Sequence, residues 1–277
     1  MNPIWLEETI RRALDEDLGP GDITSAAVIP PDATGRAVLT AKSSGRIAGL
    51  RVAIAVFQTL DPQIKYAQHV NDGDDVEAGT TLLTLAGKTA AILSAERVAL
   101  NFLQHLSGIA TATREAVAAA APYGVQIVDT RKTTPGLRAL EKEAVRLGGG
   151  RNHRFGLYDA VMLKENHIAA AGGIHAAVAR VRAYVGHTVK VEVEAETLEQ
   201  VAEALDAGAD IILLDNMDEA TIKQAVDYVQ GRAVLEASGG ITLDRVAAVA
   251  ACGVDMISLG WITHSAPALD ISLLLDT

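Results

Sequence analysis

Four apolar segments recur at a nearly constant interval in the second half of the chain. They begin at Val189, Asp210, Ala233 and Asp255, about 22 residues apart, which is the length of one strand and one helix with short connections. Consecutive units of this kind form a parallel sheet, and a repeat this regular favours an α/β barrel. Two apolar segments precede the repeat, so the predicted strands are 125–130, 160–164, 189–194, 210–215, 233–238 and 255–260. Only six strands are visible in this pattern.

Residues that typically begin and end helices lie between the strands of the repeat. Helices are predicted to open at Thr197, which has Gln200 three residues on, and at Asp218 and Thr242. Glycines at 208 and 253 are predicted to end two of them.

Side-chain alternation predicts which residues face the barrel interior. In 189–194 the three valines alternate with Lys190, Glu192 and Glu194, so we expect helices to cover the valines and the charges to point inward. A buried charge must be paired or ligated, and a structural salt-bridge core is an alternative for Lys190, Glu192 and Glu236. The same alternation points these residues inward: Asp129, Arg131, Lys164, Asp215, Glu236, Ser238, Ser258 and Gly260.

A basic segment lies within an acidic protein. The formal net charge is −11, yet residues 129–167 carry eight basic and five acidic side chains. Arg138, Lys142 and Arg146 have the spacing of an exposed helix face. The other candidates lie at the ends of elements and predict an anionic ligand: Arg131, Lys132, Arg154 and Lys164.

Two glycine-rich turns are further site candidates. Residues 148–150 are all glycine and precede His153, so backbone there can approach a ligand closely. Residues 238–240, Ser-Gly-Gly, end a strand and open a helix, a pattern typical of a phosphate-binding turn.

The first part of the chain has a different pattern. Helices are predicted over 4–16 and 52–60, strands over 36–42, 64–70 and 81–87, and a long helix from Ser94 to about Ala121 that Gly108 is expected to interrupt. The acidic turn 71–79 lacks the spacing and closing Glu of a calcium loop, and we interpret it as a solvated turn.

Composition excludes several classes of protein. The single cysteine, Cys252, excludes an intrachain disulfide and a cysteine-based zinc site, and it favours a reducing, cytoplasmic setting. No apolar run is long enough to span a bilayer, so no membrane partner is expected. The acidic balance argues against nucleic-acid binding.

Ten motifs resemble the quinolinate phosphoribosyltransferase family, also called carboxylating nicotinate-nucleotide pyrophosphorylases, nearly from end to end. They are ALDEDLGPGDIT (13–24), HVNDGDDVEAGTTLLTLAG (69–87), ERVALNFLQHLSGIAT (96–111), DTRKTTPGLR (129–138), GGGRNHRFGLYD (148–159), VMLKENH (161–167), VEVEAETLEQ (191–200), LLDNM (213–217), LEASGGI (235–241) and GWITHSAPALDISL (260–273).

The resemblance implies an architecture and an assembly. It implies an N-terminal α/β sandwich domain (1–112), an incomplete α/β barrel catalytic domain (113–265) and a tail (266–277) that returns to the N-terminal domain. It also implies a homodimer, or a hexamer built from such dimers, in which Arg97 of one chain reaches the site of its partner.

The resemblance further implies a pentosyltransferase of NAD biosynthesis that uses quinolinate, phosphoribosyl pyrophosphate and Mg²⁺. It places the quinolinate carboxylates on Arg97, Arg131, His153, Arg154 and Lys164. Phosphates would bind Lys132, Thr133, Ser238, Gly239, Gly240, Leu259, Gly260 and Trp261. Glu194 and Asp215 would serve the ribose hydroxyls or the metal, and the catalytic set would be Lys132, Lys164, Glu194 and Asp215.

Three alternatives stay open on the sequence. One is a related phosphoribosyltransferase with another acidic aromatic substrate. Another is a lyase in which Lys164 forms a Schiff base, although nearby acids favour the charged lysine. The third is a non-enzymatic phosphate-binding protein, in which the inward acids would be idle.

Overall fold

A computed structural model describes residues 2–276 of the chain. The chain divides into two compact units, one of residues 1–112, 134–149 and 265–277, the other of residues 113–133 and 150–264. This division differs from the predicted domains in one segment, because residues 134–149 group with the first unit.

The first unit is built on an antiparallel sheet of strand order β12-β1-β5-β3. Its central strands β1 (Thr34–Ala41) and β5 (Thr81–Lys88) alternate buried and more exposed residues, as expected for a sheet with one covered face. The C-terminal strand β12 pairs with β1 from Arg36 opposite Asp276 to Ala41 opposite Ile271. The other elements are α1 (Pro3–Leu18), α2 (Ile23–Val28), β2 (Gly45–Arg46), α3 (Leu50–Leu60), β3 (Lys65–Gln68), β4 (Asp75–Val76), α5 (Arg138–Leu147) and β12 (Ile271–Asp276).

Helix α4 corrects one expectation about Gly108. The helix runs without interruption from Thr89 to Ala120 and begins five residues before Ser94. A Cβ on Gly108 would lie 2.1 Å from the carbonyl oxygen of Pro267, so glycine is needed there for the close approach of the segment before β12. Sequence alone does not distinguish this packing glycine from a helix breaker.

Helix α5 corrects a second expectation. Lys142 is only 2% exposed, so it does not share an exposed face with Arg146. Glu141 is fully buried and its Oε1 lies 2.9 Å from Nε2 of His105 on α4. The helix is therefore packed on more than one side, and i,i+4 spacing was an unreliable guide to its exposure.

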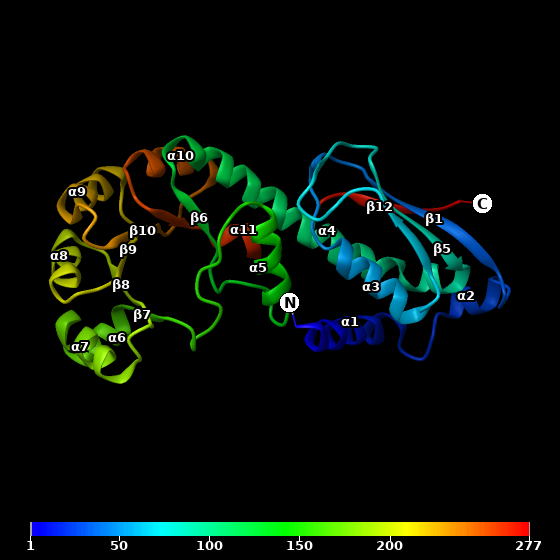
Figure 1. Ribbon diagram of the computed structural model, residues 1–277, viewed down its shortest axis with the longest axis horizontal. Coiled ribbons are helices and arrows are strands. Elements are labelled where there is room, and N and C mark those ends of the chain that lie inside the picture. The colour runs from blue at the N-terminus through cyan, green and yellow to red at the C-terminus, as the bar shows by residue number, and fades with distance from the viewer. Residues whose placement is uncertain (1, 277) are drawn as a thin grey trace. The chain divides into compact units, whose positions relative to one another are not determined.

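The second unit contains a parallel sheet of six strands in the order β6-β11-β10-β9-β8-β7, which confirms the incomplete α/β barrel (Figure 1). β6 and β7 are its two edge strands. The strands are β6 (Gln126–Val128), β7 (Val161–Leu163), β8 (Val191–Ala195), β9 (Ile211–Asp215), β10 (Val234–Ser238) and β11 (Met256–Ser258). The helices are η1 (Ala121–Tyr123), α6 (Glu165–Ala171), α7 (Ile174–Tyr184), α8 (Leu198–Asp206), α9 (Glu219–Val229), α10 (Leu243–Ala251) and α11 (Trp261–His264).

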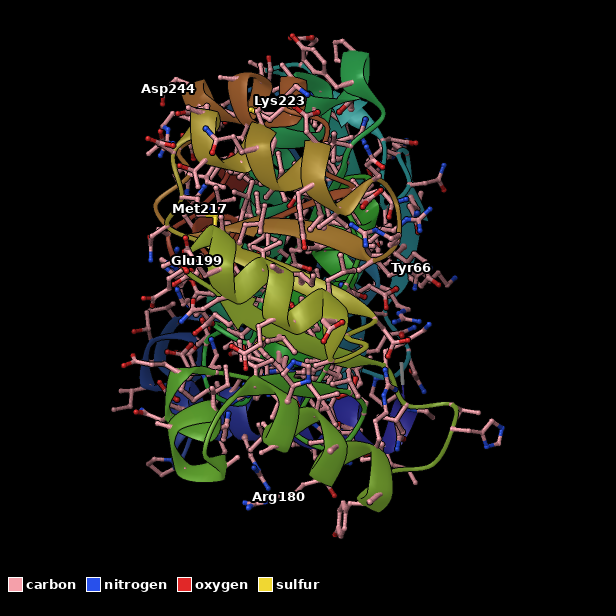
Figure 2. All side chains as sticks on the ribbon, turned by 90° about the vertical axis from the view of Figure 1, so that its left-hand side faces the viewer. Tyr66, Arg180, Glu199, Met217, Lys223 and Asp244 are labelled. Atoms are coloured by element: carbon pink, nitrogen blue, oxygen red, sulfur yellow. The ribbon has the colours of Figure 1, made fainter. Side chains whose placement is uncertain are left out.

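The helices α7 to α10 form the outer layer of this unit. Their caps agree with the sequence, because the Thr197 side chain accepts from Gln200 N at 3.3 Å and Asp218 from Thr221 N at 2.8 Å. Figure 2 looks onto this layer and shows Arg180, Lys223 and Asp244 projecting outward from α7, α9 and α10. None of the described helices is long and apolar enough to cross a membrane.

The predicted strand parity holds for most of the sheet. Val191 and Val193 are fully buried, whereas Glu194 faces a cavity inside the barrel. Lys190 is the exception, because β8 begins one residue after it and its exposed ammonium pairs with Asp210 at 3.1 Å. The expectation of an inward Lys190 was therefore wrong.

The contact at Gly108 gives a stability prediction. Gly108→Ala adds a helix-favouring residue but forces a methyl group against backbone, so we expect unfolding to become easier by about 1–3 kcal/mol. Gly186→Ala is the matched control, because Gly186 has no neighbour within 4 Å of an added Cβ. Thermal unfolding of both variants measures the difference, and equal melting temperatures would contradict the packing role.

Candidate active site

A cavity of about 540 Å³ opens within the second unit at the carboxyl ends of its strands. Barrel enzymes place their reactive groups at this end of the sheet. The predicted site residues that line the cavity are Arg131, Lys132, His153, Arg154, Lys164, Glu194, Asp215, Ser238, Gly239 and Gly240. The structure thus brings together side chains from six separate segments of the chain.

Asp129 positions the loop that carries two of these residues. Its carboxylate is fully buried at the end of β6, where it accepts from Asn152 Nδ2 at 2.6 Å and from His153 N at 2.8 Å. A bridge between Val128 and Arg151 extends the same connection. The loop after the glycines 148–150 is therefore fixed against the edge strand.

Arg131 and Arg154 give the cavity its positive character. Arg154 is half-buried and its Nη1 donates to Ala160 O at 3.2 Å. Burial, followed by the nearby charge of Arg131, lowers the pKa of Arg154. Two guanidinium groups held close together against their own repulsion favour a ligand with carboxylate or phosphate groups.

Lys164 lies opposite acids. It follows β7, and its ammonium forms an ion pair with Glu194 of β8. Burial, followed by the negative charge of Glu194, raises the pKa of Asp215 at the end of β9. Lysine and two carboxylates of neighbouring strands therefore form a second, mixed region of the cavity.

The Ser238 turn requires its two glycines. Gly239 has a φ of +92°, and an added Cβ would lie 2.3 Å from Oδ1 of Asn216. Gly240 also has a positive φ, of +57°. This backbone follows β10 and leads into α10, so its amides are available at the cavity wall.

Four predicted substrate-binding residues of this unit do not line the cavity: Thr133, Leu259, Gly260 and Trp261. The segment after β11 nevertheless supports Lys132, because Thr263 Oγ1 donates to Lys132 O at 2.8 Å. A Cβ on Gly260 would lie 3.0 Å from the Lys132 side chain. Arg97 lies on α4 in the first unit and does not line this cavity.

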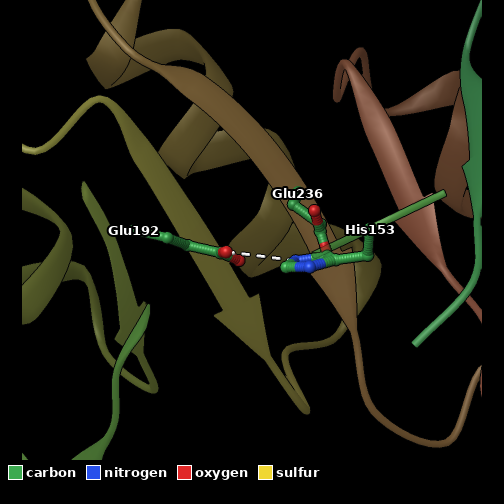
Figure 3. A group of neighbouring side chains, drawn as sticks. All are labelled: His153, Glu192 and Glu236. Carbon is green, nitrogen blue, oxygen red and sulfur yellow. Dashed lines mark ion pairs between the residues drawn. The ribbon is translucent and has the colours of Figure 1, made fainter. Parts of the chain in front are cut away.

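His153 and Glu236 of this cavity form a buried cluster with Glu192 (Figure 3). Nε2 of His153 lies 3.1 Å from Oε2 of Glu192 and 3.6 Å from Oε1 of Glu236. Both carboxyl groups are 2% exposed. Nδ1 of His153 accepts from Arg154 N at 2.7 Å, so the ring proton lies on Nε2 and faces the two acids.

Two carboxyl groups so close together cannot both ionise without cost. Burial, followed by the charge of Glu192, raises the pKa of Glu236 to about 7. The salt-bridge core considered from the sequence thus contains Glu192 and Glu236, with His153 in place of Lys190.

Met162 and Leu213 also line the cavity, and the sequence analysis did not select them. Each lies two residues before a predicted site residue, Lys164 or Asp215, and therefore shares its face of the sheet one layer deeper. The period-two pattern could have identified both. Thr130 and Asn216, which lie after strands β6 and β9, carried no such signal.

Comparison with known proteins places this site in a family. Residues 22–107 match the family model of the quinolinate phosphoribosyl transferase N-terminal domain, and residues 109–274 match that of its C-terminal domain. A probable carboxylating nicotinate-nucleotide pyrophosphorylase of Bacillus subtilis is 47% identical, over 99% of this chain and 94% of its own length. A decarboxylating quinolinate phosphoribosyltransferase of Nicotiana tabacum is 45% identical, over 98% and 82%.

Solved structures agree. The nicotinate-nucleotide pyrophosphorylase from Francisella tularensis has a TM-score of 0.96 and 39% identity, covering 100% of this chain and 98% of the other. NadC from Streptococcus pyogenes has a TM-score of 0.95 and 42% identity, covering 100% and 99%.

The raised pKa of Glu236 predicts how stability depends on pH. An acid with a higher pKa in the folded state favours folding at low pH, and this contribution is lost as pH rises from about 4.5 to about 7. Relative to Glu236→Gln, the wild-type free energy of unfolding should therefore fall between pH 5 and pH 8, by on the order of 1–3 kcal/mol. Denaturant titrations at the two pH values measure this change.

Asp227→Asn is the control for that measurement. Asp227 is an exposed carboxylate on α9 that pairs with Lys223. The same loss of a carboxyl group should give no such difference there. A difference between wild type and Glu236→Gln that does not vary with pH would show that Glu236 ionises normally in the folded protein.

Proposed function

Because the chain belongs to the quinolinate phosphoribosyltransferase family, we propose that it transfers phosphoribosyl from phosphoribosyl pyrophosphate to quinolinate. The products are nicotinate mononucleotide, pyrophosphate and CO₂. The observation that carries this proposal is the cavity in which Arg131, Arg154 and Lys164 lie with Glu194 and Asp215. Two anionic substrates need such cations, and a ribose or a metal needs such acids.

Quinolinate would bind at the arginine side of the cavity. Its two carboxylates suit the guanidinium forks of Arg131 and Arg154, and the Lys164 ammonium supplies a third charge. His153 was a candidate for the same task. Its Nδ1 accepts a backbone N–H and its Nε2 faces Glu192, so we assign it to positioning the neighbouring groups.

Phosphoribosyl pyrophosphate would occupy the other side. Lys132, the amides of the 238–240 turn and the loop 259–261 would hold its phosphates, with Thr133 beside Lys132. Glu194 and Asp215 would contact the ribose hydroxyls or the Mg²⁺ that accompanies this substrate. The raised pKa of Asp215 beside Glu194 fits such a cation, because a nearby positive charge relieves the repulsion of two carboxylates. Bound Mg²⁺ would neutralise charge on the leaving pyrophosphate.

The reaction needs no protein nucleophile. The pyridine nitrogen of quinolinate attacks C1 of the ribose as the bond to pyrophosphate breaks, and the developing oxocarbenium charge is stabilised by the acids at this side of the cavity. Ribosylation makes the ring nitrogen cationic. The 2-carboxylate can then leave as CO₂, because the adjacent positive charge stabilises the electron pair left on C2.

Two of the alternatives raised by the sequence can be distinguished from the proposed reaction. A related phosphoribosyltransferase would prefer another acidic aromatic acid over quinolinate. A Schiff-base lyase would need an uncharged Lys164, whereas the ion pair with Glu194 favours the charged amine.

We extend the proposal to the assembly and location. A homodimer, alone or within a hexamer, would let Arg97 on exposed α4 surface complete the quinolinate site of a partner chain. The single cysteine and the NAD-precursor chemistry favour the cytoplasm.

Product analysis tests the activity. Quinolinate, phosphoribosyl pyrophosphate and Mg²⁺ should give CO₂ and pyrophosphate in equal amounts, and nicotinate in place of quinolinate should give little of either. Lys164 should not be trapped by borohydride in the presence of quinolinate. Release of CO₂ without consumption of phosphoribosyl pyrophosphate would refute the transferase and support a lyase.

Subunit mixing tests the shared site. Arg97→Ala and Lys164→Ala should each be nearly inactive alone, because each removes a cation from every site. A mixed dimer contains one site with both residues intact, so mixing after reversible dissociation should restore up to about a quarter of wild-type activity for random pairing. No recovery after verified exchange of subunits would contradict the contribution of Arg97 across an interface.

A further inference from the structure

Glu236 is a buried acid to which the proposed reaction assigns no role. It lies on β10 two residues before Ser238 and lines the same cavity one layer deeper. The residue is only 2% exposed, and its Oε1 has no hydrogen-bond partner among the described residues. Its side chain nevertheless lines the cavity, so a substrate bound there would lie beside this carboxyl group.

The groups around Glu236 come from several elements. Glu192 of β8 and Asp129 after β6 are acids, and His153 lies between Glu192 and Glu236. Ser258 of β11 is also part of the lining. The neighbourhood of Glu236 is thus more acidic than basic, and this favours a protonated Glu236.

His153 acts in the opposite direction, because its charge lowers the pKa of Glu236. Burial and the charge of Glu192 have larger effects, and both raise this pKa. The guanidinium of Arg154 acts on Glu192 and can balance one carboxylate. The second carboxyl group is then left to hold a proton, and Glu236 is the one whose pKa is raised to about 7.

The proposed reaction requires a proton at one stated atom. Loss of CO₂ from the ribosylated ring breaks the bond between C2 and the carboxylate and leaves the electron pair on C2. The product carries hydrogen at C2, so a donor must deliver one proton there. A buried donor that lines the cavity is shielded from water and can act before CO₂ recombines with the ring.

We propose that Glu236 is the general acid that protonates C2 as CO₂ departs. This inference rests on the proposed function. The Glu236 carboxyl O–H transfers its proton to C2, the new C–H bond takes the electron pair released by decarboxylation, and Glu236 becomes a carboxylate. Solvent returns the proton after product leaves. Glu192 acts as a positioning residue, because its negative charge raises the pKa of Glu236 and so favours its acid form.

A metal ion fits this cluster less well. One ligand atom each from His153, Glu192 and Glu236 lie within 4.8 Å of one another. However, Nε2 of His153 carries the ring proton and so offers no lone pair, and the charge of Arg154 already acts on Glu192. The geometry therefore favours a shared proton.

Glu236→Gln tests the acid, because it keeps the shape but has no acidic proton. We expect kcat to fall about 10²- to 10⁴-fold with little change in the KM for quinolinate. In wild type, kcat should fall as pH rises above about 7, since the acid form is required, and this limb should be absent in Glu236→Gln. A wild-type solvent deuterium isotope effect on kcat should also change in the variant.

Glu192→Gln provides a second readout that a purely structural role would not give. Removing the neighbouring negative charge lowers the pKa of Glu236, so the falling limb should move to lower pH. Asp227→Asn should leave the profile unchanged. The proposal is overturned if the fall of kcat at high pH is unaltered in Glu236→Gln. It is also overturned if this fall occurs at the same pH in Glu192→Gln as in wild type, and this second variant gives the answer if Glu236→Gln does not fold. Absence of pyrophosphate release by the wild type would instead refute the proposed function.

Discussion

The rest of the site depends on the hydrogen bonds that the carboxylate of Asp129 accepts. The barrel is incomplete, so β6 is an edge strand, and among the described residues a single bridge, of Val128 with Arg151, continues its ladder into the loop beside it. The fully buried Asp129 binds Asn152 and the His153 amide and so holds this loop to the end of β6. Removing this acceptor would leave two partly buried donors without it, at a cost of about 1 kcal/mol each. The positions of His153 and Arg154 follow from that anchor.

The cavity separates its charges in a way that suits two substrates. Arg131 lies close to Arg154, whereas Lys164 pairs with Glu194 and lies near Asp215. A uniformly basic cavity would bind both substrates but would oppose the positive charge that develops on the ribose. Acids placed near the ribose would stabilise that charge, so binding and transition-state stabilisation are assigned to different walls.

The period of the strands explains why much of this was predictable. Alternation in 189–194 identified Glu194 as inward, the regular spacing of the repeat identified four of the parallel strands, and the two strands before the repeat were found as apolar segments. The failures have a common cause. Lys142, Lys190 and Gly108 depend on where an element begins or on what packs against it, and neither is encoded in a local pattern.

The site's least predictable feature is the protonation of its buried cluster. Alternation placed Glu192 and Glu236 inside the barrel, but which ring nitrogen of His153 faces them depends on a single hydrogen bond from Arg154 N. That bond is local in sequence, yet its consequence appears only where two distant strands bring their carboxyl groups to the same ring. Sequence could therefore locate the acids without indicating which of them keeps its proton.

The buried cluster lowers the stability of the fold, and this indicates that it serves the reaction. Two adjacent buried carboxyl groups destabilise a fold, because one must either ionise without water or stay protonated above its usual pKa. A glutamine at 236 would fill nearly the same volume and accept the same contacts without that penalty. Stability alone thus gives no reason for an acid at this position. A reaction that leaves an electron pair on a ring carbon, in a cavity that already holds arginines and lysines, does give one, since it needs a proton beside the substrate rather than another positive charge.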